Sequence, residues 1–438
     1  MLLLLLLVVV LRAPAQILHA HRCVLRRSGS DSKMGASCSC TVDSGEAISN
    51  TSNLQLEQHR VICELTPEQQ QAHESATAVQ EAAVRAACAM PRSERPVRGK
   101  WDAFGGARLV ELMANTTIVD IIFLIHLIAA GGIVPRWQDL PLAACITEEH
   151  VWRLRSWDQP LSLPILVLSY PWLDCHHPDR LGETLRCLLP IFESLLAKAR
   201  ETNPHGTVGV VMDFMSLPQK PFGSLAEGTR FKKGLYQINE WYAQPFTIVL
   251  MVTTALPSGA DYTNKRKHKN RGWCYFEWRI SSIVKTNICL WDLSLYKGAT
   301  TFSECVRQMV AERAPPMSPK RFGDEMRRSV RSGDLAFTAS ADMEMVIQQY
   351  ERGFVRAFDT YRQLSRGGID TEGIITYMGL GWGDDVVPSL IEAFEYAQTH
   401  CTFSDGGLQV MCARVNNFSN EQIDLLLSLS QPSKLKIM

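Results

Sequence analysis

The sequence lacks three patterns that would assign it to a class at once. Its 13 cysteines form no Cys-x-x-Cys pair, its formal net charge is zero, and no apolar run is long enough to cross a bilayer. Unpaired cysteines favour reduced thiols in a reducing compartment over a disulfide framework. Balanced charge makes nucleic acid an unlikely partner. A chain of 438 residues with 46% hydrophobic content should fold into two or three globular domains.

The N-terminus has one apolar run, LLLLLLVVVL, at residues 2–11, with Arg12 directly after it. This length suits the apolar region of a signal peptide, although no Lys or Arg precedes the run. Residues 1–33 are therefore interpreted first as a leader or upstream extension, and residues 1–15 would direct the chain to the secretory pathway.

A second interpretation starts at Met34, where the chain reads MGASCSC. If translation begins there, Gly35 becomes N-terminal, and Ser39 completes the N-myristoylation pattern. Cys38 and Cys40 are candidates for palmitoylation, and a second acyl chain would make the anchor stable. This interpretation predicts a cytoplasmic lipoprotein at the inner face of a membrane, and it is incompatible with a leader.

Composition divides the rest of the chain into segments. The apolar stretch Ile121–Ala130 is short for a membrane span and is predicted to be a buried core helix. The expected segments are a flexible stretch with an Ala-rich helix (34–100), a helical subdomain (101–160), an α/β domain (161–310), a linker (311–340) and a C-terminal α/β region (341–438).

The α/β prediction for the middle segment rests on apolar runs that alternate with helical stretches. This alternation is typical of a parallel sheet with helices on both faces. The predicted strands are 164–169, 208–213, 246–253 and 287–293.

The C-terminal region contains two similar segments, beginning at Leu380 and Val415. Each has a turn-like start and an apolar helical end, and each follows a short strand-like run. Two degenerate repeats resembling leucine-rich repeats would explain this pattern, and an ordinary small α/β appendage would explain it equally well.

Candidate site residues follow the predicted strands, because ligands bind at the carboxyl ends of the strands in open α/β sheets. The first strand leads into Ser169, Tyr170 and Trp172, and the second leads into Asp213 and Pro218. After the third strand come the basic residues 265–271 and then the stretch RGWCYFE, residues 271–277. Cysteine, histidine and aspartate at 175–179 lack the spacing of a metal site, so no metal is predicted.

Glu277 is the residue of that stretch with the strongest functional indication. On a helix that begins near Trp273, it lies at the edge of the buried stripe formed by Phe276, Ile280 and Ile283. A carboxylate in that setting would be partly desolvated, with a raised pKa and a functional role. Alternatively, it would only complement the helix dipole.

This order of motifs resembles the Toll/interleukin receptor (TIR) domain family over roughly residues 161–295. In that family the first strand ends in Ser-Tyr, Asp and then Pro follow the second strand, and the helix after the third strand begins with Trp-Cys-x-x-Glu. The chain also looks like uncharacterised TIR-like proteins of protists and algae. The matching residues are Ser169, Tyr170, Asp213, Pro218, Trp273, Cys274 and Glu277.

The resemblance implies a flavodoxin-like fold, self-association through TIR-like surfaces, and cleavage of NAD or NADP in signalling. Glu277 would be the catalytic residue of this NAD(P)+ glycohydrolase, and an aromatic side chain (Tyr170, Trp172 or Trp273) would stack on a ring of the substrate. Arg271 and its basic neighbours would contact the diphosphate. NAD or NADP would be the substrate, with no other cofactor required.

An alternative is a TIR-like interaction module without catalysis. The exit of the first strand into Pro171 and Trp172, instead of the family's usual Arg and acidic pair, favours that alternative.

Overall fold

The computed structural model describes residues 106–154, 163–244, 247–254, 261–365, 374–402, 408–412, 416–431 and 434–438. The predictions for the leader, the acylation sites Gly35, Cys38 and Cys40, and the Ala-rich helix lie outside these residues. Within the described ranges, no helix is long and apolar enough to cross a membrane.

The main sheet has six strands in the order β2-β1-β4-β3-β5-β6. Strands β4, β3, β5 and β6 run parallel, whereas β1 pairs antiparallel with both β4 and β2. The chain is therefore a mixed α/β protein with a mostly parallel sheet. The strands are β1 (Ile118–Asp120), β2 (Cys145–Ile146), β3 (Ile165–Ser169), β4 (Gly209–Val211), β5 (Thr247–Met251) and β6 (Leu290–Asp292).

Successive residues of a strand point to opposite faces of the sheet. Helices cover both faces, and the side chains of each face belong to a different hydrophobic cluster. In β3, Ile165 and Val167 join one hydrophobic cluster, and Leu166 and Leu168 join another. The first cluster includes residues of α5 (Gly106–Met113), α7 (Glu148–Leu154), α11 (Leu225–Ala243) and α12 (Gly272–Ser281). The second includes residues of α6 (Ile121–Ala129), α8 (Glu183–Cys187), α9 (Leu189–Thr202), α10 (Asp213–Ser216) and α13 (Phe302–Met309).

Residues 106–154 differ from the expected helical subdomain because they contribute β1 and β2 to the main sheet. These strands have three and two residues, too few to show a periodic pattern in the sequence. The expected core helix is present as α6, and the Asp120 side chain caps it by accepting a hydrogen bond from the amide of Ile122.

Residues 311–340, expected to be a linker, contain helix α14 (Pro319–Ser332). The Ser318 hydroxyl caps this helix by accepting from the amide of Arg321, and Pro319 occupies the first turn. Phe322 and Met326 are buried, while most of the charged residues remain at least partly exposed. A proline and many charges are thus compatible with an amphipathic helix whose apolar stripe is narrow.

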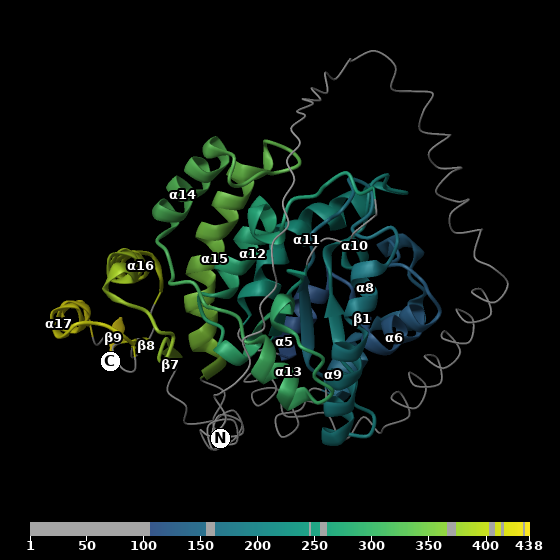
Figure 1. The fold of residues 1–438 in the computed structure, drawn as a ribbon, viewed down its shortest axis with the longest axis horizontal. Coiled ribbons are helices and arrows are strands. Elements are labelled where there is room, and N and C mark those ends of the chain that lie inside the picture. Colours follow the sequence, from purple (N-terminus) through teal and green to yellow (C-terminus); the bar gives the residue numbers. More distant parts are fainter. Residues whose placement is uncertain are drawn as a thin grey trace, which may run out of the picture. The chain divides into compact units, whose positions relative to one another are not determined.

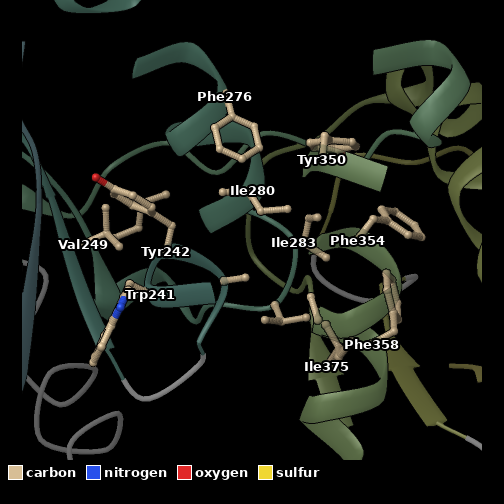
Figure 2. Packing of buried hydrophobic residues seen from close by; sticks show 14 of the residues in the cluster. Trp241, Tyr242, Val249, Phe276, Ile280, Ile283, Tyr350, Phe354, Phe358 and Ile375 are labelled. Carbon is tan, nitrogen blue, oxygen red and sulfur yellow. The ribbon is translucent and has the colours of Figure 1, made fainter. Parts of the chain in front are cut away.

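Helices α14 and α15 (Asp342–Ser365) form a further layer against α11 and α12 (Figure 1). Figure 2 shows Phe276 and Ile280 of α12 between Tyr242 on one side and Tyr350 and Phe354 on the other. Helix α12 is therefore enclosed by hydrophobic side chains from the sheet side and from α15, which fixes its position.

The C-terminal region has three parallel strands in chain order, β7 (Ile374–Thr376), β8 (Leu408–Met411) and β9 (Leu435–Ile437). Helices α16 (Val387–His400) and α17 (Asn420–Ser428) lie between them in sequence. The two expected strand-turn-helix units are present, and β9 is an additional strand. Asn416 ties successive turns together, because its amide donates to the carbonyls of Tyr377 and Cys412.

Arg313 joins this region to the end of α12. Its side chain is buried, and its guanidinium donates to the carbonyls of Ser282 and Thr376 at 3.0 and 2.8 Å. The Tyr377 ring lies under the guanidinium, and the Tyr377 hydroxyl donates to the carbonyl of Ile283. The helix that carries Glu277 is thus held at its C-terminal end by the C-terminal region.

We expect Arg313→Met to lower the free energy of unfolding by about 2–3 kcal/mol, because it leaves buried carbonyls without donors. Arg321→Met is the matched control. Arg321 also links α14 to the C-terminal region, through Glu392 at 2.8 Å, but that pair is exposed. The control should change stability by less than about 1 kcal/mol. Equal losses in urea unfolding would contradict the role given to Arg313.

Candidate functional site

The candidate site lies at the carboxyl ends of the parallel strands. Ser169 is the last residue of β3, Asp213 follows β4, and Glu277 lies in the second turn of α12. The sheet thus brings Ser169, Asp213 and Glu277 together, as the sequence predicts.

A chain of short hydrogen bonds connects three side chains in the site. The Ser169 hydroxyl donates to Oε2 of Glu277 at 2.5 Å, and Nε2 of His268 lies 2.7 Å from the same hydroxyl oxygen. Ser169 and His268 are buried, whereas Glu277 keeps part of its surface in solvent. The carboxylate is therefore held from the interior, on a residue that is half-buried.

His268 was not identified from the sequence. It lies within the basic run 265–271, which reads as a solvated loop, and nothing in its neighbours marks it as buried. The structure places it in a short 3₁₀ helix (His268–Asn270) directly before α12.

Removal from bulk water raises the pKa of the Glu277 carboxyl from its usual 4.5 to about 8. Hydrogen bonds from Ser169 and Tyr242 oppose that shift, and the nearby charge of Asp213 adds to it. Burial also raises the pKa of Asp213 to about 6. The site holds two carboxyl groups that change protonation near neutral pH, as acid–base and ion-stabilising sites require.

Trp172 forms one wall of the site beside Asp213. Its indole nitrogen donates to Oδ2 of Asp213 at 2.9 Å, and its ring packs edge-on against Phe214. Because Trp172 is only partly buried, its ring offers an aromatic surface beside the Asp213 carboxyl group that a ligand could contact.

Arg271 anchors the loop before α12. Its guanidinium is buried and donates to the carbonyls of Trp172, Asn264 and Arg266. These bonds use its donors for structure, which leaves few for the diphosphate contact expected from the sequence. Four basic side chains of the same loop are exposed, namely Lys265, Arg266, Lys267 and Lys269.

Three other expected site residues point elsewhere. The Tyr170 hydroxyl donates to the buried carboxylate of Asp179 at 3.0 Å. The Trp273 indole donates to Asp342 on α15 at 3.0 Å, and Pro218 is buried. Cys274 is buried, with its thiol pKa raised by desolvation, which suits packing more than reactivity.

Within the described part of the chain, no group of three or more His, Cys, Asp or Glu side chains could hold a metal ion. His177, from the cluster at 175–179, makes structural bonds instead. Its Nε2 pairs with the carbonyl of Val134 at 2.9 Å, and its Nδ1 accepts from the amide of Asp179 at 2.9 Å.

The segment 334–337 fixes the first turn of α12. The Gly272 amide donates to the carbonyl of Ala336, and the Ala336 amide donates to the carbonyl of Asn270. The Phe337 ring occupies the space where a side chain at position 272 would lie, since a Cβ there would be 2.2 Å from its Cζ. A side chain at position 272 would therefore have to displace the Phe337 ring.

Comparison with known proteins gives no relative for this chain: no family model, curated protein or solved structure matches it.

Gly272→Ala should lower the free energy of unfolding by about 1–3 kcal/mol, because the added methyl group displaces the Phe337 ring. Gly228→Ala is the control. Gly228 lies in helix α11, and a Cβ there would be 3.3 Å from the Phe222 ring. That variant should change stability by less than about 1 kcal/mol. If thermal unfolding shows similar small effects for both, segment 334–337 does not restrain α12.

The raised pKa of Glu277 predicts a pH-dependent contribution to stability. Between pH 4.5 and about 8 the unfolded carboxyl ionises while the folded one stays protonated, so the contribution present at low pH is lost as pH rises. Relative to Glu277→Gln, the wild type should lose on the order of 2 kcal/mol across that window, because partial exposure moderates the shift. Parallel stability curves for the two proteins would show that the carboxyl titrates normally.

Proposed function

We propose that this chain is a TIR-like protein that cleaves the bond between nicotinamide and ribose in NAD or NADP. The observation that carries the proposal is the carboxyl group of Glu277, held by Ser169 at 2.5 Å and left partly open at the ligand end of the sheet. The Trp-Cys-x-x-Glu motif and the Ser-Tyr strand end, on which the TIR resemblance rests, supply the two partners of this bond.

The strand order supports the same proposal. Among the parallel strands, the order β4-β3-β5-β6 corresponds to second, first, third and fourth in the chain. A flavodoxin-like sheet has this order, and it binds ligands where the direction of winding reverses, between its first and third strands. Ser169 ends the first of these strands, and α12 follows the third.

Cleavage of NAD requires little acid catalysis, because nicotinamide leaves as a neutral molecule. Positive charge develops on the ribose, as it does in glycoside cleavage. An ionised Glu277 facing the ribose would stabilise that charge in a site of low polarity. The Ser169 hydrogen bond favours the ionised form, and the rate should increase with pH as Glu277 loses its proton.

Trp172 and the exposed basic residues supply the remaining contacts in this proposal. The Trp172 ring lies at the Asp213 carboxylate and would stack on a base or on nicotinamide. Lys267 and Lys269 flank the buried His268 and would meet the phosphates at the mouth of the site. Self-association and membrane attachment through the N-terminus belong to the same proposal and rest on the resemblance and the Met34 motif alone.

The second candidate is a TIR-like module that binds partners and cleaves nothing. The involvement of Tyr170 and Arg271 in structural bonds favours it, because two expected substrate contacts are then lost. Helix α12 would, in that case, carry Glu277 as a buried polar group that stabilises the end of β3.

Nicotinamide release from NAD and NADP by the full-length protein tests the proposal. Glu277→Gln keeps the size and hydrogen-bonding capacity of the side chain and should lower kcat by about 10²–10³-fold, because the negative charge is gone. Glu395→Gln, an exposed glutamate on α16, is the matched control and should leave the rate unchanged.

The assay needs high protein concentration, since the proposed activity depends on self-association. No release by the wild type under those conditions would reject the enzyme and leave the binding module. Release that persists in Glu277→Gln would place the chemistry elsewhere.

A further inference from the structure

His268 is buried at the site, and the proposed mechanism gives it no role. We propose that His268 is a positioning residue that holds the Ser169 hydroxyl as a hydrogen-bond donor to Glu277. Only the catalytic consequence of this inference rests on the proposed function, because the hydrogen-bond chain itself is a feature of the fold.

The position of His268 is well defined by its surroundings. The residue is 7% exposed, and its Nε2 lies 2.7 Å from the hydroxyl oxygen of Ser169. His268 begins the 3₁₀ turn, in which the Arg271 amide donates to the carbonyl of His268. Arg271 fastens the loop to the carbonyl of Trp172, so the backbone that carries the His268 ring is held beside the end of β3.

A serine hydroxyl has one hydrogen, so the chain of contacts has a direction. In one arrangement His268 donates its Nε2 hydrogen to Ser169, and Ser169 donates to an ionised Glu277. In the reverse arrangement a protonated Glu277 donates to Ser169, Ser169 donates to the bare Nε2, and the ring hydrogen is on Nδ1. The histidine tautomer therefore selects which form of Glu277 is stabilised.

The groups around the Glu277–Ser169–His268 hydrogen bonds decide how His268 acts. Burial lowers the pKa of His268 to about 4, and the charges of Asp292 and Arg271 have opposing smaller effects. The ring is thus neutral near pH 7 and acts through its hydrogen bond, not through charge. Tyr242, Asp213 and Cys274 face Glu277 from α11, the end of β4 and α12, and each interacts with it electrostatically.

Loss of the Nε2 hydrogen frees the Ser169 hydroxyl to turn away from Glu277. The ionised carboxylate then loses a donor, and its pKa rises further. For an enzyme that needs ionised Glu277, the ascending limb of the pH profile would move to higher pH, while the rate at its plateau would be retained.

The direct test is the titration of Glu277 in the full-length protein by NMR of ¹³C-labelled glutamate carboxyl carbons, with the resonance assigned by its loss in Glu277→Gln. His268→Leu should raise the midpoint by about one pH unit, and His268→Gln, which keeps an N–H donor, should raise it by less than half as much. His205→Leu, at an exposed histidine, should have no effect. His268→Phe replaces the leucine variant if that variant does not fold.

An unchanged midpoint in folded His268→Leu or His268→Phe would overturn the proposal, as would equal shifts in the glutamine and leucine variants. If the wild type cleaves NAD, the ascending limb of kcat/KM should shift with the NMR midpoint. A uniform loss of activity at every pH would give His268 a purely structural role. If the wild type cleaves nothing, the proposed function fails, and the titration still decides the role of His268.

Discussion

A carboxyl group that is largely removed from water needs partners, and for Glu277 the principal partner is the Ser169 hydroxyl at the end of β3. The bond joins two residues that are 108 positions apart in the chain. It forms only if β3 and α12 are aligned closely, so much of the packing around α12 serves to hold that alignment. The geometry of the site is thus a consequence of how one helix is fixed.

Helix α12 is restrained at both ends and on two sides. Segment 334–337 crosses its first turn at Gly272, and Arg313 binds the carbonyls that follow its last turn. Side chains from α11 and α15 enclose its apolar stripe, as Figure 2 shows. Because α14, α15 and the C-terminal strands supply these restraints, they belong to the architecture of the site.

The sequence predicted what depends on continuous patterns and missed what depends on a few residues or on side-chain direction. The four parallel strands were predicted because each is a buried apolar run, whereas β1 and β2 are too short for a periodic signal. The helical period places Glu277 at the edge of the buried stripe, and its catalytic role is what the resemblance of Trp-Cys-x-x-Glu to the TIR family implies. His268 was missed, and Arg271 was expected at the substrate, because composition does not reveal which member of a basic run turns inward.

We propose that Glu277 faces the ribose of a nicotinamide nucleotide. A crystal structure of the full-length Glu277→Gln variant soaked with NAD tests it most directly, because the substitution keeps the shape of the site and slows cleavage. We expect the nicotinamide ribose to lie against residue 277, with Trp172 stacked on a ring and the phosphates toward Lys267 and Lys269. NAD bound elsewhere, or an empty site at saturating NAD, would contradict it.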